Sequence, residues 1–221
     1  MPFSPDDLQA VVFDMDGVLI DSEVLYKKHA RETFKDLGYE LTDALHLSTV
    51  GLPGPDGEKL IRAAMGDDFP MEEFDAIWRD RVAAAMMDHV PLKPGVREIL
   101  TLLDELEIPT AVATSSSYEA ANHHLQRADL LQHFSALVTG DQVENGKPHP
   151  EPFLLAAERL EVDPELCLAV EDSHNGIRAA HAAGMQTIMV PDLLAATPEM
   201  EELSIAVMKN LFDVIGRFEQ N

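Results

Sequence analysis

The second half of the chain alternates between two patterns of apolar and polar residues. In one pattern apolar residues recur every three or four positions, as in an amphipathic helix, and in the other a short apolar run reads as a buried strand. The helical stretches are "GVREILTLLDELE", "YEAANHHLQRAD", "PEPFLLAAERL" and "NGIRAAHAAG", and the strand-like runs are "PTAVATS", "ALVTG", "LCLAVED" and "QTIMV". Regular alternation of this kind predicts a parallel sheet with right-handed crossovers and helices on both faces.

A long helical block precedes this alternation. After the apolar run "AVVFD", Asp21 or Ser22 can cap a helix that ends near Leu37, where Gly38 supplies a C-terminal stop. From there to "PLKPG", apolar residues keep helical spacing in "GPDGEKLIRAAMG" and "MEEFDAIWRDRVAAAMM". The block therefore predicts an all-helical insertion directly after the first strand.

These patterns predict two domains of different architecture. We expect residues 1–20 and 91–221 to form a Rossmann-like α/β core, with a parallel sheet between two layers of helices. We expect residues 21–90 to form an inserted α-helical cap domain. A chain of 221 residues is long enough for one such core and a modest insertion.

The charge of the chain narrows the range of partners. With 16 Lys and Arg against 40 Asp and Glu, the formal net charge is -24, which argues against a nucleic-acid partner because phosphate backbones are bound by basic patches. An anionic substrate must instead be attracted by local features such as a metal ion, a lysine or a helix N-terminus. The single cysteine, Cys167, lies in an apolar run and is predicted to be a buried thiol.

Neither a membrane nor an export signal is indicated. The segment "MPFSPDDLQA" is acidic and lacks the basic and apolar regions of a signal peptide. No stretch approaches the roughly 18 apolar residues of a membrane-spanning helix. We therefore expect a cytoplasmic protein without a membrane partner, and we expect it to be a monomer.

Polar residues follow the predicted strands at one edge of the sheet, where open parallel sheets bind ligands. Carboxylate oxygens are the ligands that Mg²⁺ prefers, and a metal ion beside a hydroxyl and a lysine is a suitable site for a phosphoryl group. In such a site Asp14 would attack phosphorus, while Asp16 would protonate the leaving oxygen and later activate water. The residues at the strand ends are Asp14, Asp16, Thr114, Ser115, Lys147, Glu171 and Asp172.

Four of these segments resemble the motifs of a known family. "FDMDGVLIDSE", "VATSSS", "GKPHPEPF" and "VEDSHNGIRAAHAAGM" are similar, in order and approximate spacing, to the four motifs of the haloacid dehalogenase superfamily, in particular its phosphatases similar to β-phosphoglucomutase. The resemblance implies that Asp14 is the nucleophile and Asp16 the general acid and base. It also implies that Thr114 and Lys147 hold the phosphoryl oxygens, with Ser115 as a further candidate contact to the substrate.

The resemblance further implies a metal site and a mobile cap. Asp172 would bind Mg²⁺ together with the Asp14 side chain and the Asp16 carbonyl oxygen, and Glu171 would hold metal-bound waters in the outer shell. The helical block resembles the small cap of the family. The expected activity is that of a phosphoric monoester hydrolase, a Mg²⁺-dependent phosphatase that acts on a small phosphorylated metabolite through an aspartyl-phosphate.

Three alternatives stay open at this point. The first is a β-phosphoglucomutase-type mutase, whose cap contributes a histidine and, farther along, an arginine. In this chain Tyr26 stands at the place of the histidine, and "TVGLPGPDG" offers no arginine, which favours hydrolysis. A receiver domain uses similar residues, yet its phosphoacceptor follows a mid-chain strand. A phosphate-binding protein without activity is the third alternative. Dehalogenases and phosphonate hydrolases of the family lack an acid at the position of Asp16.

Several side chains have a plainer structural interpretation. Thr114 and the serines after it can form a helix N-cap, and Lys147 can be a solvated loop lysine. We predict that the chain's His123, His124 and His149 are surface residues. The remaining assignments concern the cap: Trp78, Met86 and Met87 have the spacing of a helical core, and Tyr26, Arg79 and Arg81 are candidates for substrate specificity.

Overall fold

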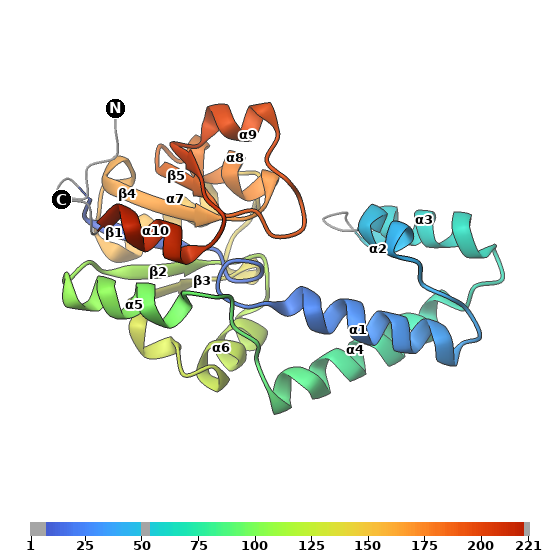
Figure 1. Cartoon of the computed structure of the whole chain (residues 1–221). Helices are drawn as coiled ribbons and strands as arrows, with labels where there is room; N and C mark the ends of the chain where they lie inside the picture. Colours follow the sequence, from blue (N-terminus) through green and yellow to red (C-terminus); the bar gives the residue numbers. More distant parts are fainter. Residues whose placement is uncertain (1–7, 50–53, 219–221) are drawn as a thin grey trace. The chain divides into compact units, whose positions relative to one another are not determined.

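A computed structural model describes residues 8–49 and 54–218 of the chain (Figure 1). These residues form two compact units. One is the helical segment Ser22–Val90, called the cap below, and the other, called the core, is built from the chain on either side of it. Within the described residues, no helix combines the length and the apolar character that a membrane span requires.

The core contains a parallel sheet at its centre. The described residues supply six strands in the order β3-β2-β1-β4-β5-β6. The first strand, β1, therefore lies between β2 and β4, which both come after the cap in the sequence. The five predicted strands are confirmed, and β6 was not predicted because two residues carry no periodic signal. The strands are β1 (Ala10–Phe13), β2 (Thr110–Ala113), β3 (Ala136–Val138), β4 (Cys167–Glu171), β5 (Gln186–Met189) and β6 (Ala206–Val207).

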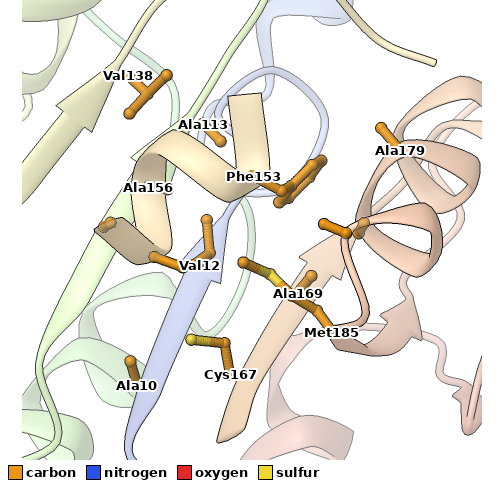
Figure 2. Packing of buried hydrophobic residues seen from close by; sticks show 14 of the residues in the cluster. Ala10, Val12, Ala113, Val138, Phe153, Ala156, Cys167, Ala169, Ala179 and Met185 are labelled. Atoms are coloured by element: carbon orange, nitrogen blue, oxygen red, sulfur yellow. The ribbon is translucent and has the colours of Figure 1, made fainter. Parts of the chain in front are cut away.

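Helices cover both faces of this sheet, which confirms the three-layer arrangement. All four residues of β1 are fully buried, as expected for a parallel strand that is covered on two sides. Figure 2 shows Phe153 and Ala156 of α7 (Glu151–Leu160) lying over Val12, with Ala179 of α8 (His174–Ala182) on the same side. On the opposite face, α5 (Val96–Glu105) packs against α10 (Leu211–Phe218).

The remaining core helices are short and begin at polar caps. α6 (Tyr118–Arg127) begins after Ser117, whose Oγ accepts a hydrogen bond from the backbone N–H of Ala120 at 3.4 Å. α9 (Pro198–Leu203) begins in the same way after Thr197. A side-chain oxygen at this position satisfies one of the free N–H groups of the first turn. The predicted serine cap of α6 is thus Ser117, which leaves Thr114 and Ser116 for other contacts.

The described part of the cap consists of two pairs of helices around an aromatic core. Phe34 is 1% exposed, and its ring centroid lies 5.0 Å from those of both Phe69 and Phe74. Gly38 follows the first helix with a positive φ of 86°, so the predicted glycine stop is confirmed. The cap helices are α1 (Ser22–Asp36), α2 (Asp43–Thr49), α3 (Gly54–Met65) and α4 (Met71–Asp88).

The methionine prediction for the cap was right for one residue of the pair. Met86 is 1% exposed and belongs to the interior, and Trp78 packs against the aromatic core with its ring stacked 6.2 Å from Phe74. Met87 is 56% exposed, because the next residue of a helix points about 100° away from its neighbour. Met87 was therefore wrongly assigned to the cap core.

Candidate active site

The first two acids lie at the carboxyl end of the central strand. The backbone N–H of Asp14 donates to Val170 O at 2.9 Å, which extends the ladder between β1 and β4 by one residue. Gly17 then turns the chain with a φ of +91°, a conformation that residues with a side chain rarely adopt. A Cβ at Gly17 would lie 2.4 Å from Oδ2 of Asp172, so the glycine also makes room for that carboxylate. The β1 and β4 loops are therefore in close contact.

Lys147, in the segment between β3 and α7, reaches the acids of these strands. Its Nζ lies 2.5 Å from Asp14 Oδ1 and 2.6 Å from Glu171 Oε1, and its side chain is only 6% exposed. The ring of Phe153 also lies beside it, with its centroid 5.0 Å from the ammonium. The alternative of a solvated loop lysine is wrong, because Lys147 is buried between two carboxylates.

The loop after β2 contributes a residue that the sequence analysis missed. Ser116 Oγ donates to Asp16 Oδ2 at 3.0 Å, and its backbone N–H donates to Thr114 Oγ1 at 3.1 Å. Thr114 is 2% exposed, whereas Ser115 is exposed, and its role as a substrate contact stays a prediction. The run of three serines was the available signal, but spacing alone does not tell which hydroxyl meets the acid.

Glu171 is held by protein groups on both of its oxygens. Oε1 accepts from Lys147, and Oε2 accepts from the backbone N–H and the hydroxyl of Ser173 at 2.8 and 2.9 Å. A Cβ at Gly176 would lie 1.7 Å from Oε1, so this position requires a glycine. Glu171 thus binds Lys147, and its expected role in the outer shell of a metal ion stays a prediction.

Several carboxyl groups are buried around one lysine, so the negative charges that the site could carry outnumber its positive charge. Burial raises the pKa of Asp14 to about 7, and Glu171 and Asp16 add to this effect while Lys147 opposes it. Burial, followed by repulsion from Glu171 and Asp14, also raises the pKa of Asp172 well above its ordinary value. The pKa of Lys147 is raised, because its two carboxylate partners outweigh the effect of burial. The lysine thus stays protonated while the acids favour a proton or another cation.

The same residues fit a hard divalent cation. Asp14 and Asp172 offer carboxylate oxygens from adjacent loops, and oxygen donors with unbalanced negative charge are what Mg²⁺ selects. Within the described residues, no three His, Cys, Asp or Glu side chains are grouped as a complete metal cage. A site of two side chains and one backbone carbonyl, with waters and substrate completing the shell, agrees with this observation.

Other predicted residues have structural surroundings of their own. His149 is exposed as predicted, but His123 and His124 are half-buried, and burial lowers the pKa of His124. Their placement as surface residues was therefore wrong, because α6 turns them toward the protein. Cys167 is fully buried as predicted, and burial raises the pKa of its thiol to about 11.

The cap contains a cavity of about 240 Å³ that includes one of the three specificity candidates. Tyr26 lines it and makes an edge-to-face contact with Trp78, at a centroid distance of 5.7 Å. Arg81 instead binds Asp36 and Thr33 of α1, and Arg79 lies beside Asp75. The loop "TVGLPGPDG", on which the mutase comparison depended, falls partly on residues 50–53, outside the described residues.

Comparison with known proteins agrees with this geometry. Residues 11–190 match the family described as haloacid dehalogenase-like hydrolase. The chain belongs to this family. A haloacid dehalogenase-like relative from Thermotoga maritima, described as a phosphorylated carbohydrates phosphatase, is 36% identical over 91% of this chain and 94% of its own. The resemblance inferred from the four motifs is thereby confirmed.

Two solved structures of haloacid dehalogenase-like proteins have the same fold. One, from Thermotoga maritima and provisionally assigned as a beta-phosphoglucomutase, has a TM-score of 0.83 and 34% identity, covering 97% of this chain and 100% of that one. The other, a family hydrolase from Deinococcus radiodurans with bound phosphate and sodium, has a TM-score of 0.84 and 26% identity, covering 97% and 96%. This likeness agrees with a Rossmann-like core that carries a helical insertion.

Proposed function

We propose that this chain is a Mg²⁺-dependent phosphatase that hydrolyses a small phosphorylated metabolite, such as a sugar phosphate, through an aspartyl-phosphate. The observation that carries the proposal is the contact between Lys147 Nζ and Asp14 Oδ1 at 2.5 Å. A nucleophilic carboxylate needs a cation beside it when it approaches a phosphoryl group, because both carry negative charge. Lys147 meets this need, and Glu171 keeps it in place.

The proposed reaction has two steps, each with one bond formed and one broken. In the first, an oxygen of Asp14 bonds to phosphorus, the bond between phosphorus and the leaving oxygen breaks, and Asp16 gives that oxygen a proton. In the second, Asp16 takes a proton from water, the water oxygen bonds to phosphorus, and the bond to Asp14 breaks. Inorganic phosphate leaves, and both acids return to their starting states.

The contacts of Asp16 suit this double role. Ser116 binds Oδ2, while Oδ1 is buried without a hydrogen-bond partner among the described residues. A buried oxygen without a partner is costly unless a ligand satisfies it. We assign proton transfer to Oδ1, and we assign the binding of phosphoryl oxygens to Lys147 and Thr114.

The metal would be held by the side chains of Asp14 and Asp172 and by the carbonyl oxygen of Asp16. Haloacid dehalogenase-like phosphatases generally use Mg²⁺, which when bound supplies positive charge against the charge on the transferred phosphoryl group. The Deinococcus radiodurans structure contains bound phosphate and sodium, which supports the binding of an anion and a cation in this fold. The local shortage of positive charge in this chain supports it independently.

The substrate class follows from the relatives rather than from the described cap. The Thermotoga maritima relative is a phosphorylated carbohydrates phosphatase, which supports a sugar phosphate or a similar phosphomonoester here. Initial rates with sugar phosphates, phosphoglycolate and nucleotides in the presence of Mg²⁺ would identify the preferred class. A cytoplasmic location and a monomeric state stay predictions.

The Asp14→Asn variant tests the nucleophile. An amide cannot attack phosphorus but nearly preserves the shape of the side chain, so we expect phosphate release to fall by at least about three orders of magnitude without unfolding. Asp129→Asn is the matched control, because Asp129 is exposed and has a positive φ of 56° that asparagine tolerates. Turnover of the Asp14 variant within tenfold of the parent would refute the assignment.

The mutase alternative keeps some support from the solved structure assigned as a beta-phosphoglucomutase. A mutase must return the phosphoryl group to the sugar, whereas a phosphatase transfers it to water. Incubation with β-glucose 1-phosphate, a trace of glucose 1,6-bisphosphate and Mg²⁺ distinguishes them when glucose 6-phosphate and free phosphate are both followed. We expect free phosphate to dominate, and an excess of glucose 6-phosphate by about an order of magnitude would favour the mutase.

A further inference from the structure

The two chain segments that connect the core to the cap are paired with each other. Ile20, before the cap, forms an antiparallel bridge with Leu92, after it. Asp21 N donates to Pro91 O at 2.9 Å, and Lys93 N donates to Leu19 O at 3.0 Å. The residues on either side of the bridge are thus fixed by backbone hydrogen bonds, and this short ladder belongs wholly to the core unit.

The ladder continues to the proposed general acid. Ile20 also forms a bridge with Asp16, and Gly17 N donates to Ile20 O at 2.8 Å. The backbone of Asp16 is therefore held by Ile20, and Ile20 is held by Leu92. Asp16 and Leu92 are thus joined through two adjacent backbone contacts of Ile20.

The side chain of Lys93 ties this ladder to a different loop of the core. Its Nζ lies 2.7 Å from Asp192 Oδ1 and 3.6 Å from Asp21 Oδ1. The side chains of Lys93 and Asp192 are 19% and 13% exposed, so the contact is largely shielded from water. Burial alone would lower the pKa of Lys93, but Asp192 and Asp21 outweigh it and raise the pKa.

Asp192 lies in the loop after β5. Val190 N donates to Glu171 O at 2.7 Å, so this loop is bonded to the last residue of β4. Lys93 thus connects the loop of Asp16 on one side with the loop after β5, and through it the end of β4, on the other. Asp192 Oδ2 is buried without a partner among the described residues, so loss of Lys93 would leave its whole carboxylate unpaired.

We propose that Lys93 is a positioning residue for the reaction, which fixes Asp16 relative to the end of β4, next to Asp172, through its ion pair with Asp192. This inference rests on the proposed function, in which Asp16 transfers the protons. Lys93 acts through the backbone of Leu19 to Ile20, and the ion pairs of its side chain within the described residues are with Asp192 and Asp21, which do not react. Misplacement of an acid by as little as about 1 Å can cost a hundredfold in rate.

The proposal predicts which steps depend on Lys93. Steps that need Asp16 are the protonation of a poor leaving group and the activation of water. Attack of Asp14 on acetyl phosphate needs little protonation, because its leaving group is already stable as an anion. Loss of Lys93 should therefore slow the Asp16 steps and spare the attack on acetyl phosphate.

The test compares Lys93→Met and Lys93→Arg with Arg178→Met, a control that removes the ion pair between Arg178 and Glu199 elsewhere on the core. Single-turnover rates are measured for phosphorylation by acetyl phosphate, phosphorylation by the preferred sugar phosphate and hydrolysis of the phosphoenzyme. For Lys93→Met we expect the last two to fall by about ten- to a hundredfold and the first to change less than about threefold. Lys93→Arg should recover most of the loss, and Arg178→Met should match the parent.

A double-mutant cycle tests whether Lys93 acts through Asp16. In an Asp16→Asn background, Lys93→Met should cost little further rate, because the residue that it positions is already inactive. Equal slowing of all three steps, full additivity with Asp16→Asn, or a lower melting temperature with unchanged rates would each overturn the proposal. If Lys93→Met does not fold, Asp192→Asn provides the same measurement. A parent protein that releases no phosphate from any donor refutes the proposed function itself.

Discussion

At the scale of single residues, the orientation of Asp16 depends on one hydroxyl. Ser116 binds Oδ2, and the other oxygen of the carboxylate is buried without a hydrogen-bond partner among the described residues. A carboxylate without such a contact rotates between rotamers, and each rotation moves the oxygen that would carry the proton. We therefore expect the serine to hold the rotamer that the proposed proton transfer needs.

Ser116→Ala should lower the maximal rate by about tenfold or more, because loss of a hydrogen bond to a charged group is worth about 1.5–3 kcal/mol. Ser135→Ala is the matched control, since Ser135 is exposed on the core. The measurement is kcat and KM for the preferred phosphomonoester at saturating Mg²⁺. A Ser116 variant with kcat within twofold of the parent would show that Asp16 is oriented by other means.

At the scale of elements, the cap contains a histidine whose neutral form is favoured by its surroundings. His46 of α2 is 8% exposed, and burial, followed by repulsion from Lys27 and Arg31, lowers its pKa. The folded cap thus favours neutral His46 more than the unfolded chain does. The resulting stability is fully present above the ordinary pKa of 6.5 and is lost as the pH falls below that value.

Trp78 is the single tryptophan of the chain and lies in the cap, so its fluorescence reports cap unfolding. We expect the melting temperature seen by this probe to fall between pH 7.5 and pH 5.5, and to fall less in His46→Gln, which cannot take up the proton. His89→Gln serves as the control, because His89 is exposed in the same unit. Equal pH dependence in the parent and both variants would contradict this account of His46.

The elements that were predictable from the sequence are those with a strong local pattern. β1 and β4 read as strands because both faces are buried, which leaves continuous apolar runs. α9, β6 and α10 were not predicted, since a strand of two residues and helices of six and eight residues present too few periods. Their assignment depends on tertiary packing, above all that of α10 on α5.

The site was predictable to the level of residue type and loop, but not of contact. The acids and Lys147 follow strands, so the sheet brings them together by topology alone. Which oxygen pairs with which donor depends on rotamers and on loop conformation. For this reason neither the contact of Ser116 with Asp16 nor the contacts of Glu171 with Lys147 and Ser173 were predictable from the sequence.

At the scale of the whole molecule, the net charge of the chain does not favour binding of the proposed substrate. The chain carries a net charge of -24, yet its substrate would be an anion. Long-range attraction is therefore unavailable, and binding has to rely on charge within a Debye length of about 10 Å or less. A bound cation would then serve the fold as well as the reaction, because it offsets repulsion among the buried carboxylates.

Mg²⁺ should consequently stabilise the folded protein without any substrate. At a hundred times its Kd, a ligand that binds only the folded state adds about 2.7 kcal/mol, which corresponds to a rise of roughly 5–10 °C in melting temperature for a domain of this size. NaCl of equal ionic strength is the control, because any cation screens so acidic a chain. Asp172→Asn should lose the shift specific to Mg²⁺, and an undiminished shift in that variant would place the ion elsewhere.

The central position of β1 also has a consequence for synthesis on the ribosome. Phe13 pairs with Val112 on one side and with Val170 on the other, so the strand made first is enclosed by strands made much later. At about 5–20 residues per second, this apolar segment waits roughly 8–30 s for its second neighbour. The cap, Ser22–Val90, is a continuous segment and is complete long before that. Order of translation thus favours a nascent chain in which the inserted unit is formed while the older strand still depends on chaperones for protection.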